Sequence, residues 1–250
     1  MSIKKDQKNT SVNNVVEIHN DAAWNKKGID ANDKVNYRFA IEAFSKSIEL
    51  NPHDAYAYYC RGNAHSNLKD YNKAIEDFNK FIELDPDDIY SYFLRGVAYS
   101  KLGNYKKAIE DYSSAIKLYP QLALLYNKRG IAYEKIGEQQ RAISDYSDAI
   151  LLKPNYAEAY YNRALAHSIL NQYQLSIEDF SKYISLKPDC ADAYNYRATV
   201  YFLQGKDDFG KSDTLKACAL GNCELLDFAK NKMDTAVDSD FVIIDERKLK

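Results

Sequence analysis

The sequence predicts an all-α fold, a right-handed superhelical solenoid in which antiparallel helix pairs stack one after another. Two observations support this. Similar segments recur along the chain, among them YNKAIEDFNKFIELDP and YKKAIEDYSSAIKLYP. Each recurrence ends at a proline, and the prolines follow one another at intervals of 34 residues: Pro52, Pro86, Pro120, Pro154 and Pro188. A fixed period of this size is typical of stacked repeats and not of one closed globular core.

The period places successive repeats in one register. The units are 21–54, 55–88, 89–122, 123–156, 157–190 and a degenerate sixth at 191–222. We expect residues 1–20 to form a disordered leader, 223–233 an amphipathic capping helix, and 234–250 a charged, disordered tail. Within the tail, Phe241–Ile244 resembles a short motif that adds a strand to the edge of a partner's sheet. The favoured reading is that it belongs to a plain tail, and either terminal segment could cover a binding groove.

Each unit shows two helical stretches. In the third unit, 88–101 is predicted to be one helix, and Gly103-Asn104 breaks it with turn chemistry. The second helix, 105–118, is stopped by Pro120 because proline cannot continue a helix. Short connections between helices of this length predict an antiparallel hairpin.

Apolar residues lie at spacings of three and four, which predicts one buried face per helix. The first helices carry a large ring at position 4: Trp24, Tyr58, Tyr92, Tyr126, Tyr160 and Tyr194. Position 8 holds Gly28, Gly62, Gly96 and Gly130, then Ala164 and Ala198. Glycine inside a helix costs about 1 kcal/mol relative to alanine. Its recurrence therefore predicts a close approach of a neighbouring helix. The large rings of one copy of the repeat are expected to fill the space that the glycines of another copy leave open.

The large ring, the glycine, a tyrosine at position 11 of several units, the alanine and aromatic of the second helix, and the closing proline together resemble the tetratricopeptide repeat family. The resemblance covers about residues 21–220. Position 11 departs from the family's tyrosine at Ala31, His65 and His167. Position 7, where the family prefers leucine, holds arginine from the second unit onward.

That arginine is matched by an aspartate at position 23 of the same unit. Pairing within a unit uses every arginine and every aspartate, whereas pairing across neighbours would strand Arg61 and Asp213. We therefore expect half-buried, bidentate bridges between the two helices of a hairpin. The alternative is an arginine ladder that binds phosphate or carboxylate. The predicted pairs are Arg61 with Asp77, Arg95 with Asp111, Arg129 with Asp145, Arg163 with Asp179, and Arg197 with Asp213.

The resemblance implies that the first helices line a concave groove that binds peptides. Its predicted lining is Tyr56, Tyr59, Asn63, Tyr90, Phe93, Val97, Leu124, Asn127, Ile131 and Tyr161. The rings of the second and third units are expected to form one patch that the hairpin core does not need. Relatives that act as chaperone partners hold a C-terminal carboxylate with a set of Lys, Asn and Arg. No window supplies that clamp: one gives Tyr59, Asn63, Leu94, Leu124 and Lys128, another Asn127, Ile131, Asn162, Asp192 and Tyr196.

Composition and motifs exclude several classes of function. With 34 basic and 36 acidic residues, the chain has no basic excess for nucleic acid. No apolar run reaches membrane-spanning length and the first twenty residues lack a secretory signal, so we expect no membrane insertion and a cytoplasmic location. The cysteines form no metal-binding pattern, and free thiols are expected at Cys60, Cys190, Cys218 and Cys223. No catalytic motif occurs, so we expect no enzyme activity, catalytic residue, metal or cofactor.

The sequence thus predicts a non-enzymatic adaptor that binds an apolar or aromatic peptide segment of another protein. The alternative is a structural scaffold that self-associates through its repeat ends into a homo-oligomer. Growth of the particle mass with concentration would favour the scaffold.

Overall fold

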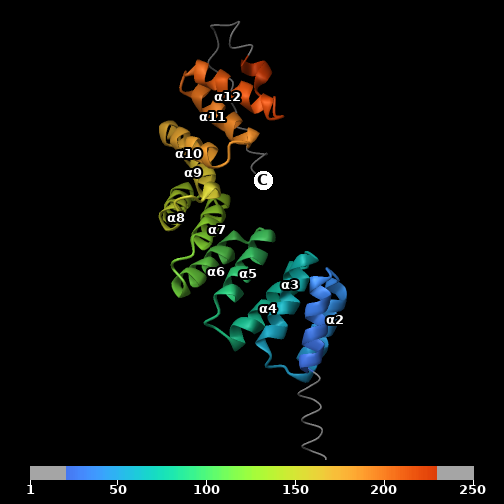
Figure 1. The fold of residues 1–250 in the computed structure, drawn as a ribbon. Coiled ribbons are helices and arrows are strands. Elements are labelled where there is room, and N and C mark those ends of the chain that lie inside the picture. The colour runs from blue at the N-terminus through green and yellow to red at the C-terminus, as the bar shows by residue number, and fades with distance from the viewer. Residues whose placement is uncertain (1–20, 230–250) are drawn as a thin grey trace, which may run out of the picture. The chain divides into compact units, whose positions relative to one another are not determined.

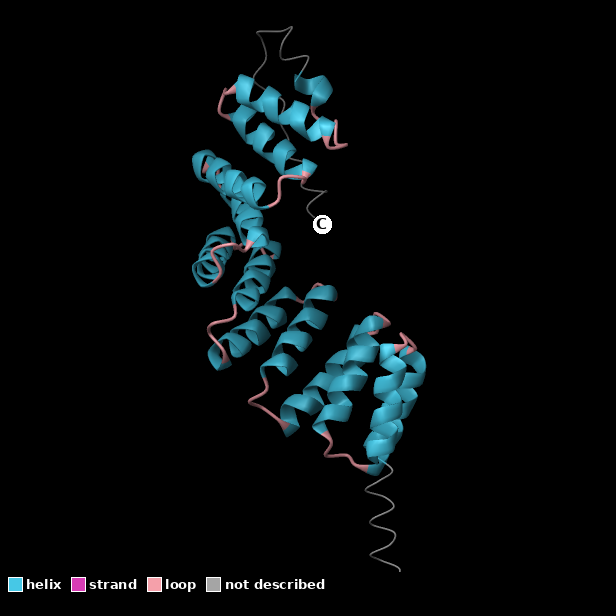
Figure 2. Cartoon of the chain, in the orientation of Figure 1, coloured by secondary structure: helices cyan, strands magenta, loops and turns pink. Residues whose placement is uncertain are grey.

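The computed structural model describes residues 21–229 of the chain, and within them helices are joined by short loops, with no strand (Figure 2). Residues 21–33 are helical and precede α2. The helices that follow are α2 (Tyr37–Leu50), α3 (Ala55–Asn67), α4 (Tyr71–Leu84), α5 (Ile89–Lys101), α6 (Tyr105–Leu118), α7 (Ala123–Lys135), α8 (Gln139–Leu152), α9 (Ala157–Ile169), α10 (Tyr173–Leu186), α11 (Ala191–Leu203) and α12 (Asp207–Ala219). The predicted leader, the tail and residues 230–233 of the predicted cap lie outside the described residues.

The chain divides after Gln121 into two compact units, the first with α2 to α6 and the second with α7 to α12, as labelled in Figure 1. In the first, each helix from α2 to α6 contacts the next, and α3 also contacts α5. In the second, the same succession runs from α7 to α12, with α7 also against α9. Each unit is therefore a solenoid of antiparallel helix pairs, and its first helices lie beside one another.

The turn inside each helix pair has the same backbone form. One residue there is left-handed, and this residue recurs every 34 positions as Val35, Lys69, Gly103, Gly137, Asn171 and Gly205. The next amide then donates to a carbonyl five residues back, as from Asn104 to Tyr99 at 2.9 Å. These bonds satisfy carbonyls that the helix end leaves open. Glycine adopts the left-handed form at little cost, whereas a β-branched residue such as Val35 does so under strain.

The glycine at position 8 has a different neighbour from the expected one. A Cβ built on Gly130 would lie 2.6 Å from Cε1 of Tyr146, and one on Gly62 would lie 2.7 Å from Cε1 of Phe78. Tyr146 and Phe78 are fully buried. The prediction of a close approach is thus right, but the ring comes from the second helix of the same pair and not from another copy of the repeat.

The chain after α12 turns back onto the last repeat. Gly221 forms a left-handed turn and residues 226–229 are helical again. Leu225, Phe228 and Ala229 pack against Ala198 and Phe202 of α11. The ring centroids of Phe202 and Phe228 lie 5.3 Å apart, edge to face. This segment therefore covers part of α11, the first helix of the last repeat.

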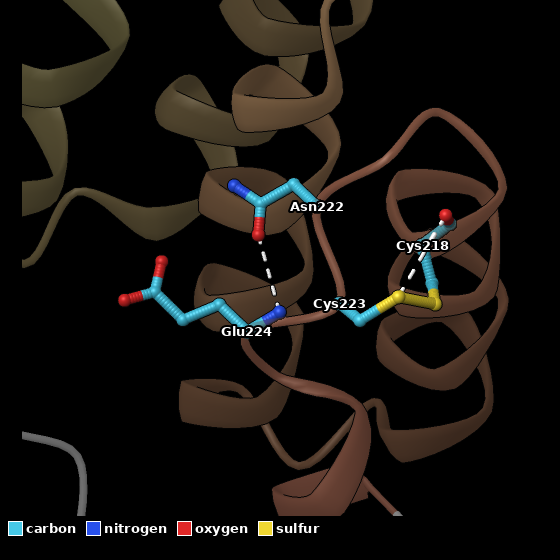
Figure 3. Close-up of a disulfide and its surroundings, with 4 residues drawn as sticks. All are labelled: Cys218, Asn222, Cys223 and Glu224. Carbon is cyan, nitrogen blue, oxygen red and sulfur yellow. Dashed lines mark hydrogen bonds between the residues drawn. A yellow bond between two sulfur atoms is a disulfide. The ribbon is translucent and has the colours of Figure 1, made fainter.

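Free thiols were expected at all four cysteines, and this is wrong for two of them. Cys218 and Cys223 form a disulfide (Figure 3), whereas Cys60 and Cys190 are free. In a continuous helix, residues five apart point in different directions. The turn at Gly221 reverses the chain after Ala219 and so brings the two sulfur atoms together.

Candidate peptide-binding surface

Each arginine at position 7 forms a bidentate bridge with the aspartate 16 residues later in its own repeat. The Nη2-to-Oδ1 distances are 2.6–2.8 Å and the Nε-to-Oδ2 distances 2.7–3.0 Å. The aspartates are buried and the arginines half-buried. For example, the hydrogen bond to Asp179 raises the pKa of Arg163. These bridges hold the two helices of one hairpin together.

A contact that the sequence did not suggest extends the bridges between repeats. In four of these arginines, the third guanidinium nitrogen, Nη1, donates to a side-chain oxygen 16 residues earlier, in the preceding repeat. The pairs are Arg61 with Ser45 at 3.0 Å, Arg95 with Asn79 at 2.7 Å, Arg163 with Ser147 at 2.9 Å, and Arg197 with Ser181 at 2.8 Å. The position-4 tyrosine of each of these repeats lies under the guanidinium, at 5.6–5.8 Å from its ring centroid. In the sequence, these contacts between repeats are indicated by the short polar residue at position 25 of each preceding repeat.

The predicted surface of the first unit lies on α3 and α5. Tyr56 and Tyr90 are 51% and 60% exposed, one on each of these two helices. The other predicted residues on the two helices, Asn63, Val97, Tyr59 and Phe93, are half-buried. Because α3 and α5 contact each other, the two exposed rings lie on neighbouring helices.

Two of the predicted rings also take part in hairpin packing, which the sequence interpretation did not expect. Tyr59 stacks on Tyr56 at 5.9 Å and meets Phe81 of α4 edge-on at 5.5 Å. Phe93 tilts against Tyr112 of α6 at 6.2 Å. Tyr59 and Phe93 are therefore used in part for packing within their own hairpins, and Tyr56 and Tyr90 provide the exposed area.

The hydroxyl of Tyr56 is tied to its own helix. A hydrogen bond with the Cys60 thiol, one turn later, is the main reason that the pKa of Tyr56 is raised to about 12. Burial raises the pKa of Cys60 to about 11. Both groups are thus neutral near neutral pH, and the surface presents an uncharged aromatic face.

The predicted residues of the second unit lie on α7 and α9 and face inward more than expected. Asn127 is buried, accepts from Asn162 at 3.1 Å and donates to the hydroxyl of Tyr156 at 3.4 Å. Tyr161 packs among Phe180, Tyr183 and Tyr196, and burial raises its pKa. Leu124 and Ile131 are half-buried. Of the ten predicted groove residues, Tyr56 and Tyr90 are the two that solvent reaches freely.

Within residues 21–229, no group of three or more His, Cys, Asp or Glu side chains is arranged to hold a metal ion. No helix in that same stretch combines the length and the apolar character that a membrane crossing requires.

Solved structures similar to this chain share its fold. A structure of MamA is 25% identical over 68% of this chain and 92% of its own, with a TM-score of 0.65. YrrB, described as a tetratricopeptide repeat protein with an unusual peptide-binding site, is 22% identical over 78% of this chain and 100% of its own, with a TM-score of 0.65. A tetratricopeptide repeat protein from Parabacteroides merdae reaches a TM-score of 0.72 at 19% identity, over 86% and 89% of the two chains.

A comparison with curated protein sequences finds no match. Sequence profiles of the tetratricopeptide repeat match residues 55–88, 89–122, 123–156 and 157–190. The four matched spans adjoin one another and cover more than half of the chain. With the stacked helix pairs and the similar solved structures, they show that this chain belongs to the tetratricopeptide repeat family.

Proposed function

We propose that this chain is a protein-interaction adaptor that binds an apolar or aromatic peptide segment across α3 and α5. The observation that carries the proposal is the exposure of Tyr56 and Tyr90 on two helices in contact. Tyrosines combine a large apolar area with a polar tip and lose little entropy on binding, so they recur where peptides and proteins are held. Tyr59 stacks on Tyr56 and packs against Phe81 as well, so it supports the exposed Tyr56 ring.

The chemistry of this surface favours side-chain recognition over recognition of a chain end. Tyr59 and Leu94 stand at two positions where a carboxylate clamp would need Lys and Asn. The arginines of the repeats donate to Asp and to Ser or Asn inside the protein, which also speaks against an arginine ladder for anionic ligands. A peptide with a blocked C-terminus should therefore bind as well as one with a free carboxylate.

End-to-end self-association is less favoured by the residues at the ends of the array. At position 25 of the last repeat, Leu215 replaces the Ser or Asn that accepts from the next arginine, and it is 62% exposed. At position 7 of the first repeat stands Lys27, with its ammonium 4.0 Å above the ring of Trp24. A second copy stacked on α12 would bring Lys27 toward Leu215 and lose the polar contact that joins repeats elsewhere.

The test begins with a library of displayed linear peptides, selected on the full chain. Affinities of the selected peptides are then measured by fluorescence anisotropy for three proteins: the native chain, Tyr56→Ala/Tyr90→Ala, and Tyr119→Ala. Tyr119 is a matched control because it is 54% exposed in the same unit but lies at the end of α6. Loss of two aromatic anchors should weaken binding on the order of tenfold or more.

The control variant should bind like the native chain, and amidated peptides should bind like free ones. Equal affinity for the native chain and the double variant would contradict the proposed site, as would selection of no peptide that distinguishes them. Sedimentation across a dilution series distinguishes the adaptor from a self-associating scaffold, because the particle mass of a scaffold would increase with concentration.

A further inference from the structure

The turn after α12 presents a disulfide at the protein surface (Figure 3). Cys218 lies in the last turn of α12 and is half-buried, whereas Cys223 follows the turn and is exposed. Thiol–disulfide exchange requires that an attacking thiolate reach one sulfur atom of the bond. The Sγ of Cys223 meets this requirement.

Hydrogen bonds support this turn, and the disulfide adds a covalent restraint to it. The amide of Gly221 donates to Cys218 at 2.9 Å, and the amide of Asn222 donates to Ala217 at 3.0 Å. The side chain of Asn222 also donates to Asp192 at 2.8 Å, which fixes the turn against the start of α11. These bonds favour the approach of the two thiols after reduction, so the disulfide can form again, and the Cys218 carbonyl oxygen, 3.7 Å from Cys223 Sγ, can accept from the new thiol.

The disulfide stands directly before the segment that covers α11. Leu225, Phe228 and Ala229 begin two residues after Cys223 and pack on Ala198 and Phe202. A cross-link between residues five apart closes a short loop, so it restricts the chain locally and contributes little to the repeats as a whole. Its effect should fall on the attachment of residues 225–229.

We propose that Cys218 and Cys223 form a reversible thiol–disulfide exchange site, which takes a dithiol reductant and governs how firmly residues 225–229 lie on α11. A thiolate of the reductant attacks Cys223 Sγ, the Cys218–Cys223 bond breaks, and Cys218 leaves as a thiolate. The second thiol of the reductant then attacks its own mixed-disulfide sulfur and releases Cys223. Two electrons pass to the protein, both cysteines take up protons, and the reductant leaves as its disulfide. The site is independent of the peptide surface on α3 and α5.

The experiment uses the full chain, oxidised with oxidised glutathione or reduced with dithiothreitol. Free thiols are alkylated and located by peptide mass, and hydrogen exchange is followed in peptides that cover residues 220–229. We expect the two-electron reduction of the disulfide to make Cys218 and Cys223 available for alkylation together, with unchanged far-ultraviolet circular dichroism. Exchange in 225–229 should rise several-fold on reduction because the segment then opens more often.

Two variants make the result specific. Cys218→Ser/Cys223→Ser should show the faster exchange in both conditions, and Cys190→Ser should respond to dithiothreitol like the native chain. The proposal is overturned if both cysteines stay free after oxidised glutathione, or if dithiothreitol opens the bond only when the protein unfolds. Equal exchange of 225–229 in the oxidised and reduced chain would overturn it as well.

Discussion

Ser147 accepts a hydrogen bond from Arg163 of the next repeat at 2.9 Å, and its own hydroxyl donates to the Ile143 carbonyl at 2.7 Å. The same guanidinium holds Asp179 through two further bonds. One arginine thus joins α8, α9 and α10. Since this arrangement recurs with the period of the sequence, each such arginine fixes both the geometry of its own hairpin and its attachment to the previous one.

Ser147→Ala should therefore lower the free energy of unfolding by about 1 kcal/mol, the usual net value of one internal hydrogen bond. Urea denaturation followed by circular dichroism measures it. Ser185→Ala is the control, since that hydroxyl is exposed and bonds only to Lys182 of its own helix. If Ser147→Ala has the same denaturation midpoint as the control, the hydrogen bond between the repeats does not contribute to stability.

Gly130→Leu should destabilise the protein by about 1–3 kcal/mol or more, because the added side chain meets the buried ring of Tyr146. Gly130→Ala should cost less, since Ala164 occupies the equivalent position opposite Phe180 in the next repeat. Thermal and urea unfolding of both variants give the order. Unchanged melting of Gly130→Leu would show that the close approach is not tight.

Val35→Gly should stabilise the chain by about 0.5–1 kcal/mol. Val35 is held at a φ of 59°, which strains a β-branched residue, and glycine releases that strain at some cost in unfolded-chain entropy. The reciprocal Gly103→Val, at a φ of 76°, should destabilise by about 1–2 kcal/mol. If both changes shift the unfolding midpoint in the same direction, the left-handed turn does not govern stability here.

His65 should make stability fall on acidification. Burial lowers the pKa of His65, against the opposing influence of Asp77 and Asp70. The unfolded chain, with a histidine pKa of about 6.5, then takes up the proton first, so the contribution is present above that pH and is lost as the pH falls toward the folded-state pKa.

His65→Tyr places there the residue found at Tyr99, Tyr133 and Tyr201. The difference in unfolding free energy between mildly alkaline and mildly acidic buffer should shrink in this variant. His53→Gln, in an exposed turn, should keep the native difference. A native-like pH profile in His65→Tyr would assign the acid sensitivity to other groups.

Features that recur in every repeat could be predicted from the sequence because their residues return at the same position of each unit. The separation of Arg61 from Asp77 places both on one hairpin, and the recurrence of Gly130 and its equivalents requires a ring or a helix close by. The acceptors at Ser45, Asn79, Ser147 and Ser181 recur as well, but short polar residues on a helix surface have many neutral explanations. Their partner becomes evident only when the next repeat is in place.

The exposure of the candidate surface could not be predicted from its own residues, because it depends on side chains elsewhere in each hairpin. Tyr59 packs against Phe81, and Tyr161 packs against Tyr183, so part of each tyrosine ring is buried. Asn127 is buried and forms hydrogen bonds with Asn162 of the next repeat and with Tyr156. The disulfide depends on the turn at Gly221, and a spacing of five residues does not reveal it without that turn. These outcomes follow from side-chain volumes and chain reversal, which helical periodicity does not encode.

The most direct test of the proposed adaptor function is hydrogen exchange of the full chain with and without a peptide selected on it. Peptide binding across Tyr56 and Tyr90 predicts slower exchange in α3 and α5, with α4 and α6 unchanged. In Tyr56→Ala/Tyr90→Ala, the same peptide concentration should produce no slowing. Protection confined to α4 and α6 or to the second unit, or protection that persists in the double variant, would contradict the assignment of this surface.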